Sequence, residues 1–361
     1  MNKHIIGIGT AVPAIAVEQE RTREVVEALF GSDVPNLPRL LRVFDHGHIR
    51  KRHFMQAPEW YKHERGFAES NAAYIEAAVA LSIEAATRAL EDAGKKASDV
   101  DVVVVASTTG IATPSLDALL MLALNIPQNA VRVPIFGLGC AAGVSGLARA
   151  AEVCEARRSM CTLFVAVEIC SATFQRRDTS KSNLVGTSLF ADGAGAVVLA
   201  CETSTTPSPF VGRGLRAAVR DSYSTLFAGT EDIMGWDIKD TGFAVRFSRD
   251  IPAFVEEHIG RAVSDACEQW GIESSAIGDF ITHPGGAKVM AAYAQALAVN
   301  MQEFSYSVDV LRDYGNMSSA TVLFVLDRML KDPAFTWSSS FAMMSSLGPG
   351  FSAEQLLLEV A

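Results

Sequence analysis

The sequence has few charged residues and no long uninterrupted apolar stretch. Lys, Arg, Asp and Glu make up 20% of the 361 residues, and the formal net charge is −10. Nucleic acids and anionic membrane surfaces are bound through clustered Lys and Arg, so neither is expected as the main partner. No run of about 18 apolar residues occurs, and we therefore expect no transmembrane helix.

Cysteine is scarce, and its spacing does not indicate a metal site. The six cysteines, at positions 140, 154, 161, 170, 201 and 267, contain no Cys-x-x-Cys pair. Neither a disulfide framework nor a zinc site is indicated, and a reducing cytoplasm is expected. His46, His48 and His53 lie close together, but no Cys or acidic cluster accompanies them, so no metal is predicted.

The N-terminal apolar stretch has only the outline of a secretory signal. One Lys precedes residues 5–17, but Gly7, Gly9 and Pro13 interrupt the stretch. These interruptions favour a first strand and turn over an exported leader.

The apolar residues that are present predict an α/β protein with a large core or two closely packed ones. Hydrophobic residues make up 49% of the chain. Residues 68–93 have helical spacing and lead into a buried strand at 102–106, and residues 251–270 lead in the same way into a strand at 279–282. Continuous apolar strands that alternate with helices indicate largely parallel sheets covered by helices. The Ser/Thr/Pro-rich segment 202–209 is the expected junction of two halves.

One spacing occurs twice and predicts a duplicated fold. Cys140 and Asn316 are 176 positions apart, as are Ser107 and His283 (316 − 140 and 283 − 107). Chance can align short apolar strands, but the order of helix, strand and Gly-containing turn also agrees between the halves. We therefore expect the Cys, the His and the Asn to meet at the centre of the molecule.

Cys140, His283 and Asn316 have the residue types of a nucleophilic site. Cys140 follows a Gly-rich turn and precedes an expected helix, whose N-terminus favours a thiolate. His283 ends a strand, and Asn316 occupies the turn that corresponds to Cys140. A lone Cys is usually a packing residue. A thiol, an imidazole and an amide at three such turns can instead activate a nucleophile and stabilise a developing oxyanion or enolate.

The sequence resembles the type III polyketide synthases of the chalcone and stilbene synthase superfamily over essentially its whole length. The resemblance rests on Gly139-Cys140 and the helix behind it, and on the segments 281–286 (Ile-Thr-His-Pro-Gly-Gly), 314–320 (Tyr-Gly-Asn-Met-Ser-Ser-Ala) and 347–351 (Leu-Gly-Pro-Gly-Phe). It implies a thiolase fold, a duplicated five-layered αβαβα architecture. The half that carries the nucleophilic Cys would span residues 1–205, and the half that carries His and Asn residues 206–361.

The resemblance also implies a mechanism. Cys140, paired with His283, would take an acyl group from a starter acyl-CoA. His283 and Asn316 would hold the thioester carbonyl of malonyl-CoA, so that loss of carbon dioxide leaves an enolate that attacks the bound acyl group. Repetition and ring closure would follow. No metal or redox cofactor is expected, and the family resemblance implies a homodimer.

Cavity and CoA-binding positions carry over from the family residue by residue. Phe190 matches one of two gatekeeper phenylalanines between the CoA tunnel and the cavity, and Val245 stands at the second, which should widen the passage. The remaining positions expected in or near the cavity are Thr113, Cys170, Thr173, Gly235 and Ser318. Arg39 and Arg42 are the favoured contacts of the CoA phosphates, with the basic segment 50–52 as a further candidate. Gly348, Pro349 and Gly350 would form the cyclisation or oxyanion loop.

Several functions remain open. Bacterial relatives commonly use fatty acyl starters to make alkylresorcinols or alkylpyrones, and a malonyl starter would give a tetrahydroxynaphthalene or phloroglucinol. A ketoacyl carrier protein synthase III would use the same three residue types with an acyl carrier protein. A hydroxymethylglutaryl-CoA synthase would need a catalytic Glu near the Cys, whereas Glu168 is expected to be a buried or interface residue. A non-enzymatic acyl-binding protein is disfavoured because Cys140, His283 and Asn316 are all intact.

Overall fold

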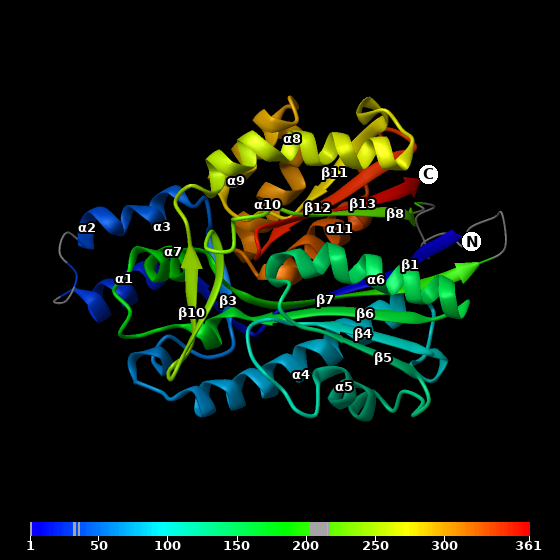
Figure 1. Ribbon diagram of the computed structural model, residues 1–361. Coiled ribbons are helices and arrows are strands. Elements are labelled where there is room, and N and C mark those ends of the chain that lie inside the picture. Colours follow the sequence, from blue (N-terminus) through cyan, green and yellow to red (C-terminus); the bar gives the residue numbers. More distant parts are fainter. Residues whose placement is uncertain (1, 32–33, 35–36, 203–214, 216) are drawn as a thin grey trace.

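The computed structural model describes residues 2–31, 34, 37–202, 215 and 217–361. A nine-stranded sheet runs through the molecule (Figure 1). Its strands, in spatial order, are β11 (Ile277–Thr282), β12 (Phe341–Gly348), β13 (Ser352–Val360), β8 (Ala217–Leu226), β1 (Asn2–Ala11), β7 (Asp192–Glu202), β6 (Thr162–Ile169), β4 (Val102–Ala106) and β5 (Val131–Ile135). The expected junction at 202–209 lies outside the described residues apart from Glu202, the last residue of β7.

The sheet consists of two half-sheets that meet along one short ladder. Between β1 and β8 only Lys3 with Val219 and His4 with Ala218 are paired. Helices α4 (Phe67–Asp92) and α5 (Leu116–Leu124) cover one outer face, and α8 (Ile251–Trp270) and α9 (Ala287–Ala296) cover the other (Figure 1). Helices α6 (Ala142–Arg157) and α11 (Thr321–Lys331) lie between the two half-sheets. The predicted five-layered thiolase architecture is confirmed.

The predicted offset of 176 residues holds for the strand and the helix that position the site, but not for every element. Adding 176 to β4 gives residues 278–282 within β11, and adding it to α6 gives 318–333, which contains α11. The residues corresponding to β5, 307–311, instead lie within the helix α10 (Ser305–Tyr314). The first half-sheet therefore has one more edge strand than the second.

The prediction of largely parallel sheets is wrong. Only the pairs β4 with β5, β4 with β6, and β11 with β12 are parallel, and the other pairs of the large sheet are antiparallel. Residues 349–351 alone connect β12 to β13. A connection this short can join only antiparallel neighbours, because a parallel crossover needs a dozen or more residues.

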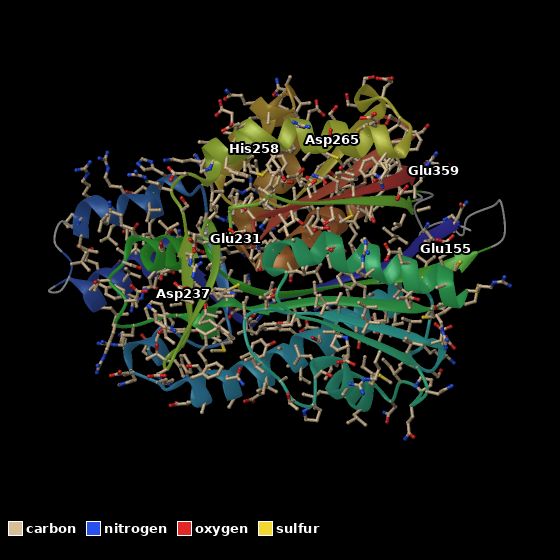
Figure 2. All side chains as sticks on the ribbon, in the orientation of Figure 1. Glu155, Glu231, Asp237, His258, Asp265 and Glu359 are labelled. Atoms are coloured by element: carbon tan, nitrogen blue, oxygen red, sulfur yellow. The ribbon has the colours of Figure 1, made fainter. Side chains whose placement is uncertain are left out.

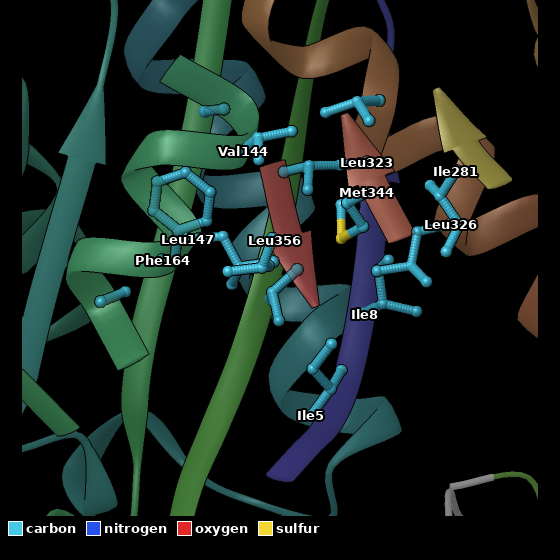
Figure 3. Close-up of a cluster of buried hydrophobic side chains, with 14 of the residues drawn as sticks. Ile5, Ile8, Val144, Leu147, Phe164, Ile281, Leu323, Leu326, Met344 and Leu356 are labelled. Carbon is cyan, nitrogen blue, oxygen red and sulfur yellow. The ribbon is translucent and has the colours of Figure 1, made fainter. Parts of the chain in front are cut away.

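Three apolar clusters hold the layers together. The largest lies around the two central helices and includes both half-sheets. Figure 3 shows part of it, with the labelled side chains Ile5, Ile8, Val144, Leu147, Phe164, Ile281, Leu323, Leu326, Met344 and Leu356. A second cluster lies beneath α4 and α5, and a third beneath α8 and α9. The nearly continuous burial of β4 and β6 reflects helices on both of their faces.

The N-terminal ends of α6 and α11 approach so closely that one of them needs glycine. A Cβ atom on Gly143 would lie 2.2 Å from the carbonyl oxygen of Ser319, far inside van der Waals contact. Ser319 belongs to the 3₁₀ helix η7 (Ser318–Ala320) that leads into α11. This contact brings the turn that carries Cys140 next to the turn that carries Asn316.

A smaller group of elements stands beside the layers, at the left of Figure 1. It consists of α1 (Gln19–Phe30), α2 (Leu37–Leu40), α3 (Arg42–His46), α7 (Lys181–Leu189), the ribbon of β2 (Ile15–Glu18) and β3 (Lys51–Phe54), and the hairpin of β9 (Met234–Lys239) and β10 (Gly242–Phe247). The remaining 3₁₀ helices are η1 (Trp60–Lys62), η2 (Ala97–Asp99), η3 (Gly139–Ala141), η4 (Cys170–Thr173), η5 (Ser274–Ala276) and η6 (Met301–Phe304). Among the described residues, no helix is long and apolar enough to cross a membrane.

Candidate active site

The three predicted site residues meet in one cavity. Cys140 lies in η3 immediately before α6, His283 directly follows β11, and Asn316 lies between α10 and η7. All three side chains line a cavity of about 770 Å³. The duplicated spacing therefore identified residues that come together from three separate turns.

The side chain of Asn316 is oriented by two hydrogen bonds. Its Nδ2 donates to the carbonyl oxygen of Gly285 (3.2 Å), and its Oδ1 accepts from the backbone N–H of Ser318 (2.8 Å). Its backbone N–H donates to the carbonyl of Leu189 at the end of α7 (2.9 Å). Because the second N–H of the Asn316 amide has no hydrogen-bond partner among the described residues, that group can donate to a ligand in the cavity.

His283 has two ring nitrogens that no described residue engages. Both are buried without a hydrogen-bond partner in the described part of the chain. Burial lowers the pKa of His283 to about 4, because the charged imidazolium would lose its hydration. At neutral pH the side chain is therefore a neutral imidazole that can accept a proton at one nitrogen and donate a hydrogen bond from the other.

Cys140 is buried, and burial affects the pKa of its thiol more than the position before α6 does. Burial raises the pKa of the thiol to about 12, while a hydrogen bond from Sγ to the Ser318 hydroxyl (3.4 Å) opposes the rise. Cys140 lies just before the N-terminus of α6, as predicted. The pKa of its thiol is nevertheless raised, because burial is the larger effect. Forming a thiolate requires a nearby proton acceptor, and the neutral imidazole of His283 lines the same cavity.

Glu168 connects the two halves beneath the site. Its carboxylate is fully buried and accepts hydrogen bonds from the Thr108 N–H (3.0 Å), the Thr109 hydroxyl (2.8 Å) and the Ser319 hydroxyl (2.6 Å). Thr108 in turn accepts a hydrogen bond from the Gly139 N–H (3.1 Å), next to Cys140. Burial raises the pKa of Glu168 to about 7 against these donors. The predicted burial of Glu168 is confirmed. Its three hydrogen bonds hold the turn after β4 and the 3₁₀ helix η7 in place.

The loop at 348–350 packs on the turn of Cys140. A Cβ atom on Gly139 would lie 2.7 Å from the Pro349 ring, and one on Gly348 would lie 2.6 Å from the Leu138 carbonyl oxygen. The neighbouring Leu347 and Phe351 line the cavity. The loop therefore packs beside Cys140, and its expected role in cyclisation or oxyanion binding stays a prediction.

The cavity has a basic rim. Arg39 and Arg42 line it as predicted. The further basic residues in its lining are Lys181, Arg249 and Lys288, together with His46. These come from four separate segments, so no run of charge in the sequence revealed them. The acidic side chains labelled in Figure 2, Glu155, Glu231, Asp237, Asp265 and Glu359, are exposed or half-exposed and belong to other parts of the molecule.

The basic segment 50–52, the other candidate contact for the CoA phosphates, has one arginine at the surface and one in the interior. Arg50 is exposed and lies 3.6 Å from Asp313. Arg52 is fully buried, and its Nη1 donates to the carbonyl oxygens of Thr187 (2.6 Å) and Phe190 (2.7 Å). The alternation of side chains along β3 turns Arg52 inward. Arg52 therefore fixes the end of α7 and is not available for phosphate.

Only some of the residues predicted to line the cavity lie close to one another in the structure. Phe190, Val245, Cys170 and Thr173 line a second, apolar pocket of about 80 Å³ beside α1 and β3. Ser318 contacts Cys140. Thr113 is exposed in the loop between β4 and α5 and is in the lining of neither space, so its expected place near the cavity stays a prediction. Gly235 lies in β9, and a Cβ built on it meets nothing within 4 Å.

No metal centre is evident in the part of the chain that the structure describes. No three His, Cys, Asp or Glu side chains there are arranged to hold an ion. His46 belongs to the cavity rim, and the Nδ1 of His53 lies 2.8 Å from the Pro13 carbonyl oxygen. The six cysteines are buried, and none of them forms a disulfide with another described residue.

Comparison with known proteins identifies the family of the chain. The family models "Chalcone and stilbene synthases, N-terminal domain" and "Chalcone and stilbene synthases, C-terminal domain" match residues 2–203 and 218–361. A "Putative chalcone synthase" of Bacillus subtilis is 39% identical over 98% of this chain and 97% of that protein. A "1,3,6,8-tetrahydroxynaphthalene synthase" of Streptomyces peucetius is 36% identical over 98% of this chain and 92% of that protein.

A more distant relative and a solved structure extend the comparison. The "Alpha-pyrone synthesis polyketide synthase-like Pks18" of Mycobacterium tuberculosis is 27% identical over 99% of this chain and 91% of that protein. The crystal structure of 1,3,6,8-tetrahydroxynaphthalene synthase from Streptomyces coelicolor, described as a bacterial type III polyketide synthase, superimposes with a TM-score of 0.89 at 30% identity and covers 99% of both chains. The chain therefore belongs to the chalcone and stilbene synthase family and is a type III polyketide synthase, an acyl-transferring condensing enzyme.

Proposed function

We propose that this enzyme condenses a fatty acyl-CoA starter with several malonyl-CoA units and cyclises the chain to an alkylpyrone or alkylresorcinol. The observation that carries the proposal is the apolar pocket of about 80 Å³ beyond Phe190. Its walls include Val25, Val26 and Leu29 of α1 together with Phe174 and Val245. An alkyl chain is stabilised in such surroundings because apolar surface leaves water.

A second candidate is a malonyl-primed synthase that makes a tetrahydroxynaphthalene or phloroglucinol. It is supported by the 36% identity to the Streptomyces peucetius tetrahydroxynaphthalene synthase, which exceeds the 27% identity to the pyrone-forming relative. A ketosynthase that accepts acyl carrier protein remains the third candidate. The three candidate functions differ in the starter that they require: a fatty acyl-CoA, malonyl-CoA or an acyl carrier protein thioester. Substrate preference therefore distinguishes them.

Cys140, His283 and Asn316 carry the chemistry in this proposal. His283 accepts the thiol proton as Sγ attacks the starter thioester, and the departing CoA sulfur then takes that proton. Neutral again, His283 donates one hydrogen bond to the malonyl thioester oxygen and Asn316 donates another. Carbon dioxide leaves, and its bonding electrons form the enolate. The enolate carbon attacks the acyl carbonyl and releases the Cys140 sulfur. The sulfur leaves as a thiolate, which attacks the thioester of the extended chain and returns that chain to Cys140. The CoA sulfur released in this step takes a proton from solvent.

Product analysis with isotope-labelled malonyl-CoA tests the proposed function. Starters with 2 to 16 carbons, malonyl-CoA alone and acyl carrier protein thioesters are supplied in parallel, and products are identified by mass spectrometry. We expect pyrones or resorcinols from long-chain starters and none with Cys140→Ala. Naphthalene or phloroglucinol products from malonyl-CoA alone would support the second candidate. Activity confined to carrier-bound acyl groups would support the third.

The pH dependence of Cys140 alkylation tests the role of His283. In the wild type, His283 can accept the proton of the Cys140 thiol. In His283→Gln no imidazole is present to accept it, and the buried thiol has a raised pKa of about 12. We expect the midpoint of iodoacetamide labelling at Cys140, followed by peptide mass spectrometry, to rise by more than about one pH unit in His283→Gln. His258→Gln, on the outer helix α8, is the matched control. Identical profiles for His283→Gln and the wild type would refute proton transfer to His283.

The basic rim is proposed to hold the CoA phosphates. Replacing both Arg39 and Arg42 by Gln removes two cations from the cavity lining. We expect the KM for malonyl-CoA to rise roughly tenfold at low ionic strength with little change in kcat, and the difference to shrink in high salt. Arg261→Gln, exposed on α8, is the control. An unchanged KM in the double variant would remove these two residues from the CoA site.

We propose a homodimer that forms through the β5 edge of the sheet. β5 is the terminal strand, and the large apolar side chains of Leu122 (72% exposed) and Phe136 (59% exposed) flank it. An uncovered apolar strand edge is an unfavourable surface for a free monomer. Light scattering should give twice 38.6 kDa for the wild type and a smaller weight-average mass for Phe136→Asp. A monomeric wild type, or a Phe136→Asp variant that associates as tightly, would rule out this interface.

A further inference from the structure

Most polar side chains in the wall of the apolar pocket keep their hydrogen bonds within the protein. Tyr61 Oη donates to Ser171 Oγ (2.8 Å), and Ser171 Oγ donates to the carboxylate of Asp192 (2.5 Å). The amide nitrogen of Asn183 donates to two backbone carbonyls. The threonine hydroxyls in the wall also donate to backbone carbonyls, namely those of Thr22, Thr173 and Thr187. These groups therefore have no N–H or O–H left for a ligand.

Arg52 differs from these side chains. It is 1% exposed and belongs to the wall of the same pocket. Its Nε donates to Gln19 Oε1 (3.0 Å), and its Nη1 donates to the carbonyl oxygens of Thr187 and Phe190. Its Nη2 is buried and has no hydrogen-bond partner among the described residues. A ligand in the pocket can satisfy this nitrogen only by supplying an acceptor.

The charge of Arg52 is already balanced by Asp192. Burial lowers the pKa of Arg52 to about 9, and attraction to Asp192 opposes this, so the guanidinium stays charged at neutral pH. Burial raises the pKa of Asp192 to about 6, which leaves its carboxylate mostly ionised. A carboxylate on the ligand would bring a second negative charge close to Asp192, out of contact with bulk water. A neutral oxygen would satisfy Nη2 without that electrostatic cost.

The pocket approaches the catalytic site on the side of Cys170. Cys170 belongs to its wall and lies close enough to Cys140 for the two thiols to interact electrostatically. An acyl chain on Cys140 that fills the pocket therefore contacts apolar side chains along most of its length and also contacts Arg52. A plain alkyl chain would leave Nη2 without a partner, whereas an oxygen on the chain would accept its hydrogen bond.

We propose that this pocket selects an acyl chain that carries a neutral oxygen remote from the thioester, a hydroxyl or a keto group, and that Arg52 Nη2 donates a hydrogen bond to that oxygen. This inference rests on the proposed function and narrows its starter from a plain fatty acyl group to an oxygenated one. Arg52 acts on the choice of starter and takes no part in proton transfer or decarboxylation.

Competition between paired starters for Cys140 tests this inference. Each pair consists of an acyl-CoA with a terminal hydroxyl or methyl ketone and the unsubstituted acyl-CoA of the same length, from 6 to 16 carbons, supplied together without malonyl-CoA. Intact-protein mass spectrometry gives the ratio of the two acyl enzymes. We expect the oxygenated chain to be favoured at least about tenfold over a narrow range of lengths, because only there does its oxygen reach Arg52. A terminal carboxylate should not be favoured at any length, because Asp192 repels it.

Arg52→Lys assigns the preference to this side chain. A lysine ammonium has three N–H groups, and the three acceptors that Arg52 now serves, on Gln19, Thr187 and Phe190, would use them all. We expect the preference to fall to about twofold or less, while the unsubstituted chain still acylates Cys140. The matched control is Arg50→Lys at the exposed position just before β3, which should keep the preference.

A second pair of variants is used if Arg52→Lys does not fold. Thr22→Phe places a ring in the pocket from α1, where Thr22 is half-buried. It should abolish the preference for the oxygenated chain and still allow Cys140 to be acylated by a 4-carbon starter. Ala28→Phe introduces the same ring at an exposed position of α1 outside the pocket lining and should keep the preference.

The outcomes separate this inference from the proposed function. Equal loading of oxygenated and unsubstituted chains at every length overturns the inference and leaves the proposed fatty acyl starter unaffected. A preference that persists in Arg52→Lys, or in Thr22→Phe where that variant is used, also overturns it. Stronger loading of the carboxylate-terminated chain overturns the choice of a neutral oxygen. A wild type that forms no acyl enzyme with any acyl-CoA contradicts the proposed function itself.

Discussion

The close approach of the α6 and α11 N-termini is the contact on which the site depends. Gly143 lies against the carbonyl oxygen of Ser319, where a Cβ atom would be only 2.2 Å away. Each helix begins at a catalytic turn, so bringing the two helix ends together also brings Cys140 and Asn316 to one cavity. The duplication of the fold supplies the two turns, and the missing side chain at Gly143 allows them to meet.

Buried polar groups hold this arrangement because apolar packing alone does not fix the orientation of a turn. Glu168 joins the turn after β4 to η7, and Arg52 joins the end of α7 to β3. Each is buried and satisfied largely by groups from segments far apart in sequence. Removing one partner from such a network leaves a buried polar group without its hydrogen bond, which is costlier than never having buried it. The Arg52 contact also fixes Phe190 beside the Asn316 turn.

The sequence predicted the site better than its surroundings. The repeated spacing located Cys140, His283 and Asn316, because a duplication places equivalent turns at equal offsets. The sequence did not predict that the residues equivalent to β5 form α10. Nor did it predict that most strand pairs are antiparallel, because the apolar content of a strand does not determine its direction. The burial of Arg52 within a basic run had no sequence signal, and the rim residues Lys181 and Lys288 come together only through tertiary folding.

The same burial that makes Cys140 a poor thiolate in isolation suits a condensing enzyme. In the mechanism proposed above, the thiol and the imidazole are both neutral before loading and become charged only while the proton is shared between them. Once the acyl group occupies Cys140, the sulfur carries no charge and His283 is free to donate to the malonyl oxygen. The low pKa of His283, about 4, keeps the imidazole available in this neutral state at physiological pH. Burial thus weakens His283 as a proton acceptor in the proposed loading step, while it favours the neutral form that the proposed condensation step needs as a hydrogen-bond donor.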